Sequence, residues 1–175
     1  MNWHPKSEHN FVCTTESGLM YGFDTRYFSA PIFTVQAHKN ACAAAAFSPH
    51  IPNLLATVGT DSLCKIWDIH AQTPEGKLEP RLIGKRDLQQ GDLFSVQFYE
   101  DIPWVLAAGG SNGELAIWDI EESTEISDHF KPSLDPNAPK EPVVNAVEDD
   151  GNNDFEDVSE EEEPVVKVSK KKSKK

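Results

Sequence analysis

The chain has 175 residues, of which 29 are acidic and 16 basic, giving a formal net charge of −13. Its apolar residues are unevenly spread, with 54 in residues 1–120 and 13 in residues 121–175. Only the first part can therefore bury a core. No apolar run approaches the roughly 18 residues of a membrane-spanning helix, and the start lacks the features of a secretory signal. The acidic total argues against a simple electrostatic grip on nucleic-acid phosphates.

The cysteines, Cys13, Cys42 and Cys64, are odd in number, far apart and outside any Cys-x-x-Cys motif. This usage indicates reduced thiols in an intracellular protein and argues against a disulfide framework or a zinc site. We expect no cofactor and no metal.

Residues 1–120 contain short apolar segments of strand length separated by turns. We expect strands at 32–35, 41–47, 54–58, 63–69, 81–83, 93–98, 104–108 and 114–120. Glycine, Asn and Asp at 59–62 and 109–113 tolerate positive φ and predict tight turns. The alanine run at 43–46 favours a helix by propensity, but the repeat described next places it in a strand. No stretch shows helical periodicity over the needed length.

An internal repeat organises these segments. Its units are marked by Phe23-Asp24, Trp67-Asp68 and Trp118-Asp119, at spacings of 44 and then 51 residues. Counting back thirteen residues from each Asp reaches Phe11, Leu55 and Leu106. Because no gap is needed inside the shared half-unit, chance is a poor explanation of the agreement.

The repeat resembles the WD repeat, the four-stranded blade unit of β-propellers. The middle unit matches most fully, with Ala37-His38 in the place of the Gly-His dipeptide, a hydroxyl at Thr57, a turn acid at Asp61, and Trp67. In such a blade the four side chains form a hydrogen-bond relay. Asp61 accepts from the His38 ring, His38 meets the Thr57 hydroxyl, and that hydroxyl meets the Trp67 indole. Since each buried polar group is then satisfied, the relay locks the blade's third strand to the loop before its first strand.

The other two units depart from this pattern. Gln89, Ala108 and Asn112 occupy the relay positions of the third unit, and the first unit has Phe23 for Trp and begins mid-blade at Trp3. The expected fold is therefore all-β. It is a partial WD-repeat β-propeller of about two and a half blades over residues 1–122, followed by a disordered acidic and then lysine-rich tail at 123–175. Because propellers need 4–8 blades to close, we expect a fragment of a longer protein. A truncated gene product and pairing with another chain are the alternatives.

Longer stretches are similar to the periodic tryptophan protein family. They include Phe23-Asp24-Thr25-Arg26, Pro31-Ile32-Phe33-Thr34, Lys65-Ile66-Trp67-Asp68-Ile69 and Lys85-Arg86-Asp87. The order and spacing resemble the last blades of that family. The resemblance implies a non-enzymatic nucleolar scaffold that assists large-subunit ribosome assembly and rRNA processing, with pre-ribosomal proteins and rRNA as partners.

The tail carries two charge blocks of opposite sign. Residues 148–163 hold ten acidic and no basic side chains, a composition that stays solvated. Ser159, followed by four glutamates, resembles an acid-directed casein kinase site, and an unmodified serine is the alternative. The lysines near the end resemble a nuclear import signal: Lys170, Lys171, Lys172, Lys174 and Lys175. A solubilising tail or a contact to RNA phosphates are the alternatives there.

Nothing in the sequence is typical of catalysis. His4 is expected to be a turn residue, and His9, His50 and His70 are expected in loops with solvated side chains. No histidine has metal-ligand spacing. Glycine-rich residues 109–113 lack the Lys-Ser/Thr of a phosphate loop and predict a β-turn. Trp3, Trp104 and Trp118 are expected in the core, with a surface anchor as the alternative for Trp104. We therefore expect a binding scaffold, not an enzyme, with no membrane and no small-molecule substrate.

Two other kinds of scaffold stay open. Acidic tails can shield basic histones, which makes a histone-binding chromatin adaptor the first alternative. A ubiquitin-ligase substrate receptor is the second. Co-purification of ribosomal precursors, of nucleosomes or of a cullin adaptor distinguishes the three.

Overall fold

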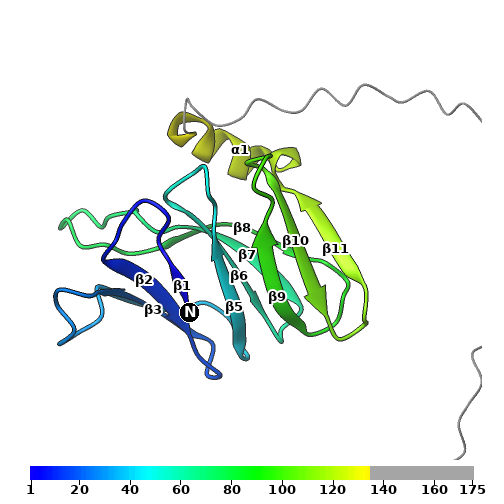
Figure 1. Cartoon of the computed structure of the whole chain (residues 1–175), viewed down its shortest axis with the longest axis horizontal. Coiled ribbons are helices and arrows are strands. Elements are labelled where there is room, and N and C mark those ends of the chain that lie inside the picture. The colour runs from blue at the N-terminus through cyan, green and yellow to red at the C-terminus, as the bar shows by residue number, and fades with distance from the viewer. Residues whose placement is uncertain (135–175) are drawn as a thin grey trace, which may run out of the picture. The chain divides into compact units, whose positions relative to one another are not determined.

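The structure, a computed structural model, describes residues 1–134, and its strands form three antiparallel sheets that follow one another along the chain (Figure 1). Sheet 1 consists of β1 (Asn2–Trp3), β2 (Asn10–Thr14), β3 (Leu19–Asp24) and β4 (Phe33–Gln36). Sheet 2 consists of β5 (Cys42–Phe47), β6 (Leu54–Gly59), β7 (Leu63–Asp68) and β8 (Arg81–Asp87). Sheet 3 consists of β9 (Leu93–Phe98), β10 (Val105–Gly110) and β11 (Leu115–Asp119).

The sequence repeat becomes a repeat of strand register. Equivalent residues lie opposite each other in every sheet: Phe11 and Phe23, Leu55 and Trp67, Leu106 and Trp118. Each unit therefore builds the same antiparallel pair with the same residues facing each other, although the units differ in length.

The turn before the third strand of each sheet is also repeated. Its equivalent residues Gly18, Ser62 and Gly113 have φ angles of 79°, 63° and 79°. This left-handed region is open to glycine and disfavoured for side chains. Ser62 adopts this conformation although it has a side chain, so the turn keeps the same backbone conformation in all three units.

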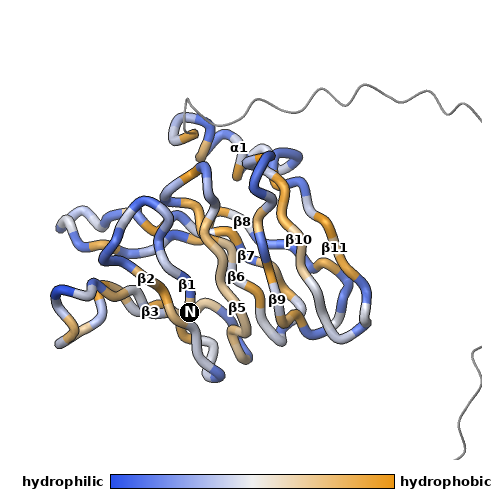
Figure 2. The backbone as a smooth tube through the Cα atoms, viewed as in Figure 1, coloured by the Kyte–Doolittle hydropathy of each residue, from blue (hydrophilic) through white to orange (hydrophobic). Residues whose placement is uncertain are grey.

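Two apolar clusters fill the spaces between neighbouring sheets. Between sheets 1 and 2 the buried residues are Val12, Met20, Phe33, Ala37, Cys42, Ala45, Phe47, Leu55, Trp67 and Ile69. Between sheets 2 and 3 they include Leu54, Ala56, Cys64, Ile66, Val96, Phe98, Trp104, Leu106 and Trp118. Sheet 2 is thus covered on both faces, which explains why every residue of β6 is buried. Figure 2 shows the corresponding apolar colouring along the central strands.

The alanine run illustrates how tertiary pairing overrides local propensity. Ala44, Ala45 and Ala46 belong to β5 and pair with β6. Small side chains let neighbouring sheets approach, and the ladder to β6 satisfies the backbone, so the helix preference of alanine is lost here. β8 likewise extends to Asp87, beyond the strand expected at 81–83, because β7 pairs with it along its full length.

Residues 123–134 correct the sequence-based division of the chain. They were expected to open the disordered tail. Instead η1 (Ile120–Glu122), α1 (Thr124–Phe130) and η2 (Lys131–Ser133) follow β11. The helix has only 7 residues, too few for a visible period, and it ends before Pro132. The remaining tail prediction, from residue 135 onward, lies outside the described residues.

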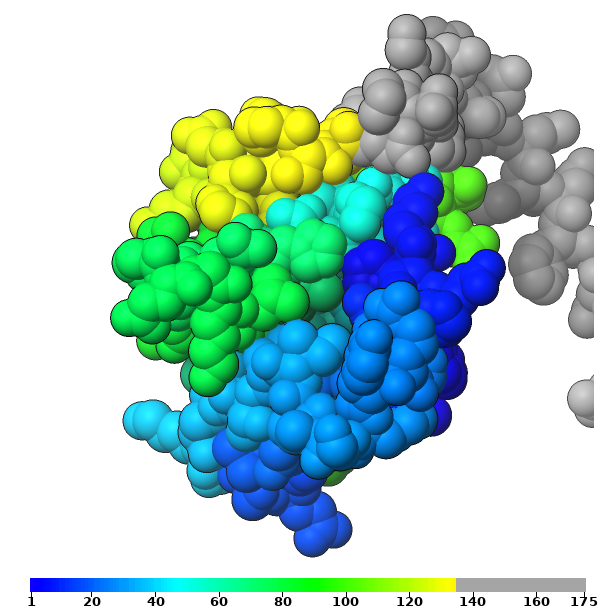
Figure 3. Space-filling model, turned by 90° about the vertical axis from the view of Figure 1, so that its left-hand side faces the viewer, coloured from blue at the N-terminus to red at the C-terminus, as the bar shows by residue number. Residues whose placement is uncertain are grey.

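Helix α1 is held by contacts to sheet 2. Ile126 and Phe130 are fully buried, and they join the cluster between sheets 2 and 3. Ile126 lies over Gly84 of β8, where an added Cβ would approach its Cδ1 to 2.7 Å. His129 Nε2 lies 2.8 Å from Asp68 Oδ2 at the end of β7. Figure 3 shows the yellow segment containing α1 against the green segment containing β8.

We predict that Phe130→Ala lowers the free energy of unfolding by about 3 kcal/mol, because it leaves a cavity where a fully buried ring packs. Equilibrium urea denaturation measures this. The matched control is Glu125→Ala on the exposed side of the same helix, which should change stability by less than about 0.5 kcal/mol. Equal effects of the two substitutions would show that α1 does not pack as described.

Candidate functional site

Four side chains from four segments meet in one hydrogen-bonded chain at sheet 2. His38 follows β4, Thr57 lies on β6, Asp61 lies in the turn between β6 and β7, and Trp67 lies on β7. Trp67 Nε1 is 2.9 Å from Thr57 Oγ1, which is 2.8 Å from His38 Nε2. His38 Nδ1 is in turn 2.7 Å from Asp61 Oδ1. The structure thus brings together the four residues singled out in the sequence.

The two ends of the relay set the direction of its bonds. An indole nitrogen only donates, so the Trp67 N–H donates to the Thr57 oxygen. An ionised carboxylate only accepts, so His38 carries its proton on Nδ1 and donates it to Asp61. Nε2 of the neutral imidazole is then unprotonated and accepts from the Thr57 hydroxyl. A neutral imidazole beside an ionised carboxylate leaves no member unsatisfied.

Burial and charge support the same protonation states. His38 is 1% exposed, and its burial lowers the pKa of the imidazole despite the hydrogen bond to Asp61. Partial burial raises the pKa of Asp61, but hydrogen bonds from His38 and from the Lys39 backbone N–H outweigh it and lower it overall. The pair is thus poised as neutral donor and anionic acceptor across the pH range of the cell.

Lys65 also holds the loop before β5, through contacts to Ala37 and Asp61. Its Nζ donates to the carbonyl oxygen of Ala37, the residue before His38, and lies 3.8 Å from Asp61 Oδ2. Burial is the largest influence on the lysine and lowers its pKa. The loop before β5 is therefore fixed by a side chain that the sequence motif does not include.

Sheet 3 joins the corresponding loops without a relay. Ala108 stands in the hydroxyl position, so no chain of side-chain bonds can form. Instead Asn112 Nδ2 donates to the Gln89 carbonyl oxygen at 3.1 Å, and the Asp92 N–H donates to Ser111 Oγ at 3.0 Å. These hydrogen bonds are exposed to solvent. They therefore hold the loops of sheet 3 less strongly than the buried relay holds the loops of sheet 2.

His4 stands at the turn expected from the sequence, but its side chain is buried. It is 7% exposed, its ring meets Phe47 edge-on, and it stacks on His70 with ring centroids 5.9 Å apart. Its Nδ1 accepts from the Lys6 N–H, and burial followed by the neighbouring His70 lowers its pKa. These contacts were not predicted, because neither histidine belongs to the relay pattern of the repeat.

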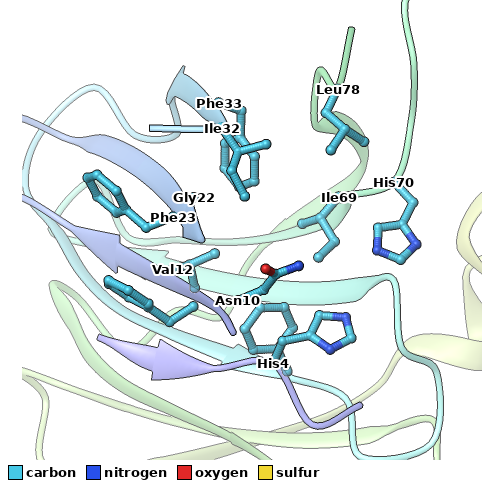
Figure 4. Close-up of a pocket in the computed structure, with 12 residues that line it drawn as sticks. His4, Asn10, Val12, Gly22, Phe23, Ile32, Phe33, Ile69, His70 and Leu78 are labelled. Atoms are coloured by element: carbon cyan, nitrogen blue, oxygen red, sulfur yellow. The ribbon is translucent and has the colours of Figure 1, made fainter. Parts of the chain in front are cut away.

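A small cavity beside His4 separates sheets 1 and 2 (Figure 4). It measures about 40 Å³ and is lined mainly by apolar side chains, with Asn10 and His70 as polar exceptions. This volume suits a water molecule and is too small for an organic ligand. The cavity is a packing feature of the sheet junction and not a substrate site.

The other residues considered in the sequence have structural surroundings. Trp104 and Trp118 are buried, as expected for core aromatics, whereas Trp3 is 49% exposed. Burial raises the pKa of the Cys42 and Cys64 thiols to about 12, which leaves them unreactive. Ser159 and the lysines at 170–175 lie outside the described residues.

Within residues 1–134, no group of three or more His, Cys, Asp or Glu side chains is arranged to hold a metal ion. No helix in that part of the chain is long and apolar enough to span a membrane.

Residues 29–68 match the family model described as "WD domain, G-beta repeat". The chain carries a WD40 repeat. An uncharacterized WD repeat-containing protein of Schizosaccharomyces pombe is 28% identical over 85% of this chain and 28% of its own length. Periodic tryptophan protein 1 of Saccharomyces cerevisiae is 26% identical over 74% of this chain and 23% of its own length. Histone acetyltransferase type B subunit 2 of Candida glabrata is 22% identical over 65% of this chain and 29% of its own length.

These relatives confirm the predicted resemblance to periodic tryptophan proteins, at low identity and alongside other WD proteins. The WD40-repeat chain spans less than a third of each relative's length. A chain in the crystal structure of the mitotic checkpoint complex is similar in fold, with a TM-score of 0.55 and 20% identity over 67% of this chain and 34% of that one. Together with the three sheets, this confirms the predicted all-β, partial-propeller fold.

We predict that Thr57→Val lowers the free energy of unfolding of the WD40-repeat chain by about 2 kcal/mol or more. Valine keeps the shape but leaves the Trp67 N–H and His38 Nε2 buried without partners, at about 1–3 kcal/mol for each group. Urea denaturation followed by tryptophan fluorescence measures the effect. Thr34→Val, at an exposed threonine of β4, is the matched control and should be near neutral. A loss no larger than the control's would contradict the relay.

We also predict that stability falls as the pH falls below about 6.5, the ordinary pKa of histidine. Because the folded-state pKa of His38 is lowered, the unfolded chain binds the proton first, so stability is complete above that pH and declines below it. Each such histidine contributes a slope of at most about 1.4 kcal/mol per pH unit. His38→Gln should flatten the dependence of melting temperature on pH. His4→Gln should flatten it separately, since the pKa of His4 is also lowered. An unchanged slope in His38→Gln contradicts the prediction.

Proposed function

We propose that this chain is part of a nucleolar WD-repeat scaffold that assists assembly of the large ribosomal subunit and processing of its rRNA. The observation that carries the proposal is the similarity to periodic tryptophan protein 1, which extends over 74% of the chain, well beyond the single matched WD40 repeat. The family resemblance seen in the sequence links such blades to ribosome assembly.

The architecture suits a binding role. The buried relay holds the loop before β5 and the turn between β6 and β7 in one conformation, and rigid sheets that present fixed loops are good platforms for protein recognition. The described part of the chain offers a packed core and exposed loops, and its two most buried thiols are unreactive. Pre-ribosomal proteins and rRNA are the partners we propose, without enzymatic turnover of a small molecule.

The charged tail fits the proposed compartment. Its lysines, Lys170, Lys171, Lys172, Lys174 and Lys175, form the proposed nuclear import signal, and the acidic block with Ser159 is a proposed phosphorylated contact to basic ribosomal proteins. Replacing Lys170, Lys171 and Lys172 by Ala should then reduce nuclear accumulation without changing the folded sheets.

The test is affinity purification of the tagged full chain from yeast cells, with quantification of the co-purifying rRNA precursors. We expect enrichment of large-subunit precursors over the tag alone. Thr57→Val, which weakens the fold, should lower the enrichment, and Thr34→Val should not. Absence of ribosomal precursors from a folded, nuclear chain would overturn the proposal.

A histone-binding adaptor is the second candidate, favoured by the similarity to histone acetyltransferase type B subunit 2. Recovery of histones without ribosomal precursors in the same purification would support it. A cullin adaptor in the purified material would instead indicate the ubiquitin-ligase receptor alternative.

A further inference from the structure

A pair of polar side chains lies in the otherwise apolar junction between sheets 1 and 2. His4 follows β1 and is 7% exposed, and Asn10 is the first residue of β2. His4 Nε2 and Asn10 Oδ1 are both buried, and neither atom has a hydrogen-bond partner within residues 1–134. Both side chains border the cavity of about 40 Å³ (Figure 4). Because a buried polar atom without a partner lowers the stability of a fold, the two atoms indicate a bound molecule that supplies one.

The repeat shows that this polar pair is specific to sheet 1. The equivalents of His4 and Asn10 in sheet 2 lie 44 residues later, at Ser48 and Leu54. Ser48 Oγ accepts from the Ile51 N–H at 3.1 Å, and Leu54 is fully buried in the cluster between sheets 2 and 3. Protein atoms alone therefore suffice at these positions of the second junction, whereas in the first junction they leave one donor and one acceptor unpaired.

The surroundings of His4 fix where its ring carries the proton. Its Nδ1 accepts a hydrogen bond from the Lys6 N–H at 3.1 Å, so Nδ1 is unprotonated. Burial lowers the pKa of the imidazole and the neighbouring His70 lowers it further, so the ring is neutral at the pH of the cell. A neutral ring with a free Nδ1 carries its proton on Nε2, which is then a donor. A protonated Nε2 has no lone pair for a metal ion, so the pair is not a metal site.

The two atoms together specify the chemistry of the bound molecule. His4 Nε2 needs an acceptor and Asn10 Oδ1 needs a donor, and a water oxygen provides both, whereas an anion only accepts. The Pro52 carbonyl oxygen, in the loop before β6, lies close enough to oppose the effect of burial on the His4 pKa, and it offers a second acceptor. A buried water makes about three hydrogen bonds and needs a cavity of roughly 10–15 Å³, so partners and volume both suffice.

We propose that the junction between sheets 1 and 2 binds an ordered water molecule, which accepts a hydrogen bond from His4 Nε2 and donates one to Asn10 Oδ1. Through the Pro52 carbonyl the water also links sheet 1 to sheet 2. The relay and the water lie at opposite ends of β5, because His38 precedes this strand and His4 packs on Phe47, its last residue. The junction thus has a polar tie at each end and the apolar cluster between them.

A high-resolution crystal structure of the full chain tests the site directly. We expect a solvent peak within about 3.2 Å of both His4 Nε2 and Asn10 Oδ1. Asn10→Leu copies the residue at the equivalent position of sheet 2, removes the acceptor and should abolish the peak. The matched control is Val12→Ala, which borders the same cavity, leaves both polar atoms in place and should keep the peak.

A double-mutant cycle tests in solution whether the two side chains share the water. His4→Phe and Asn10→Leu each leave the other polar atom without its full set of partners, whereas the double variant removes both atoms. We expect the product of the two single effects on the unfolding equilibrium constant to exceed the effect of the double variant by roughly tenfold in urea denaturation. The control cycle pairs His4→Phe with Val96→Ala in the other apolar cluster, where the effects should multiply to within about twofold.

Three results would overturn the proposal. They are a wild-type crystal structure in which His4 Nε2 bonds directly to a protein atom with no solvent peak beside it, a peak that persists unchanged in Asn10→Leu, and a cycle whose effects multiply as in the control. The wild-type structure needs no variant, so the proposal stays testable if a variant fails to fold, which circular dichroism would show. None of these measurements involves ribosomal precursors, so this inference can fail while the proposed function stands.

Discussion

The interaction on which sheet 2 depends is the chain of bonds from the Trp67 indole to the Asp61 carboxylate. It joins a strand interior, a neighbouring strand, a turn and the loop entering the sheet, four places that the backbone ladder alone does not connect. Its middle members, Thr57 and His38, are almost completely buried. In that setting an unpartnered polar atom lowers the stability of the fold, so the relay stabilises the sheet only when all four groups are present. Sheet 2 in turn contributes to both apolar clusters, which makes the relay central to all three sheets.

The same need for hydrogen-bond partners explains why the units of the repeat keep the relay residues to different degrees. Sheet 2 has neighbours on both faces, and its polar groups have no access to water. Sheet 3 is open on one side, and its loops are joined by Asn112 and Ser111 at a wet rim. Ala108 is itself buried, but Gln89 stands in the histidine position of this unit, so the missing hydroxyl leaves no buried imidazole without a partner. Loss of the motif thus need not indicate loss of the blade.

The sequence predicted those features that repeat or that obey a strict period. Most strand positions of sheets 2 and 3, the tight turn at 59–62 and the partners of His38 all follow from aligning three units of one chain. The features it missed occur once: the stacking of His4 on His70, the Lys65 contact to the Ala37 carbonyl, and helix α1. Each depends on residues brought together only by the folded sheets. A seven-residue helix whose stability comes from two buried side chains has no periodic signature of its own.

The contact between Ile126 and Gly84 has a consequence for the history of this chain. An added Cβ at position 84 would lie 2.7 Å from the Cδ1 methyl group of Ile126, so the isoleucine would have to move or be replaced by a shorter residue. A side chain at 84 should therefore be found more often together with a shorter side chain at 126. Co-variation between positions 84 and 126 among descendants of a common ancestor would show that the packing of α1 on β8 has been kept while the rest of the helix surface changed.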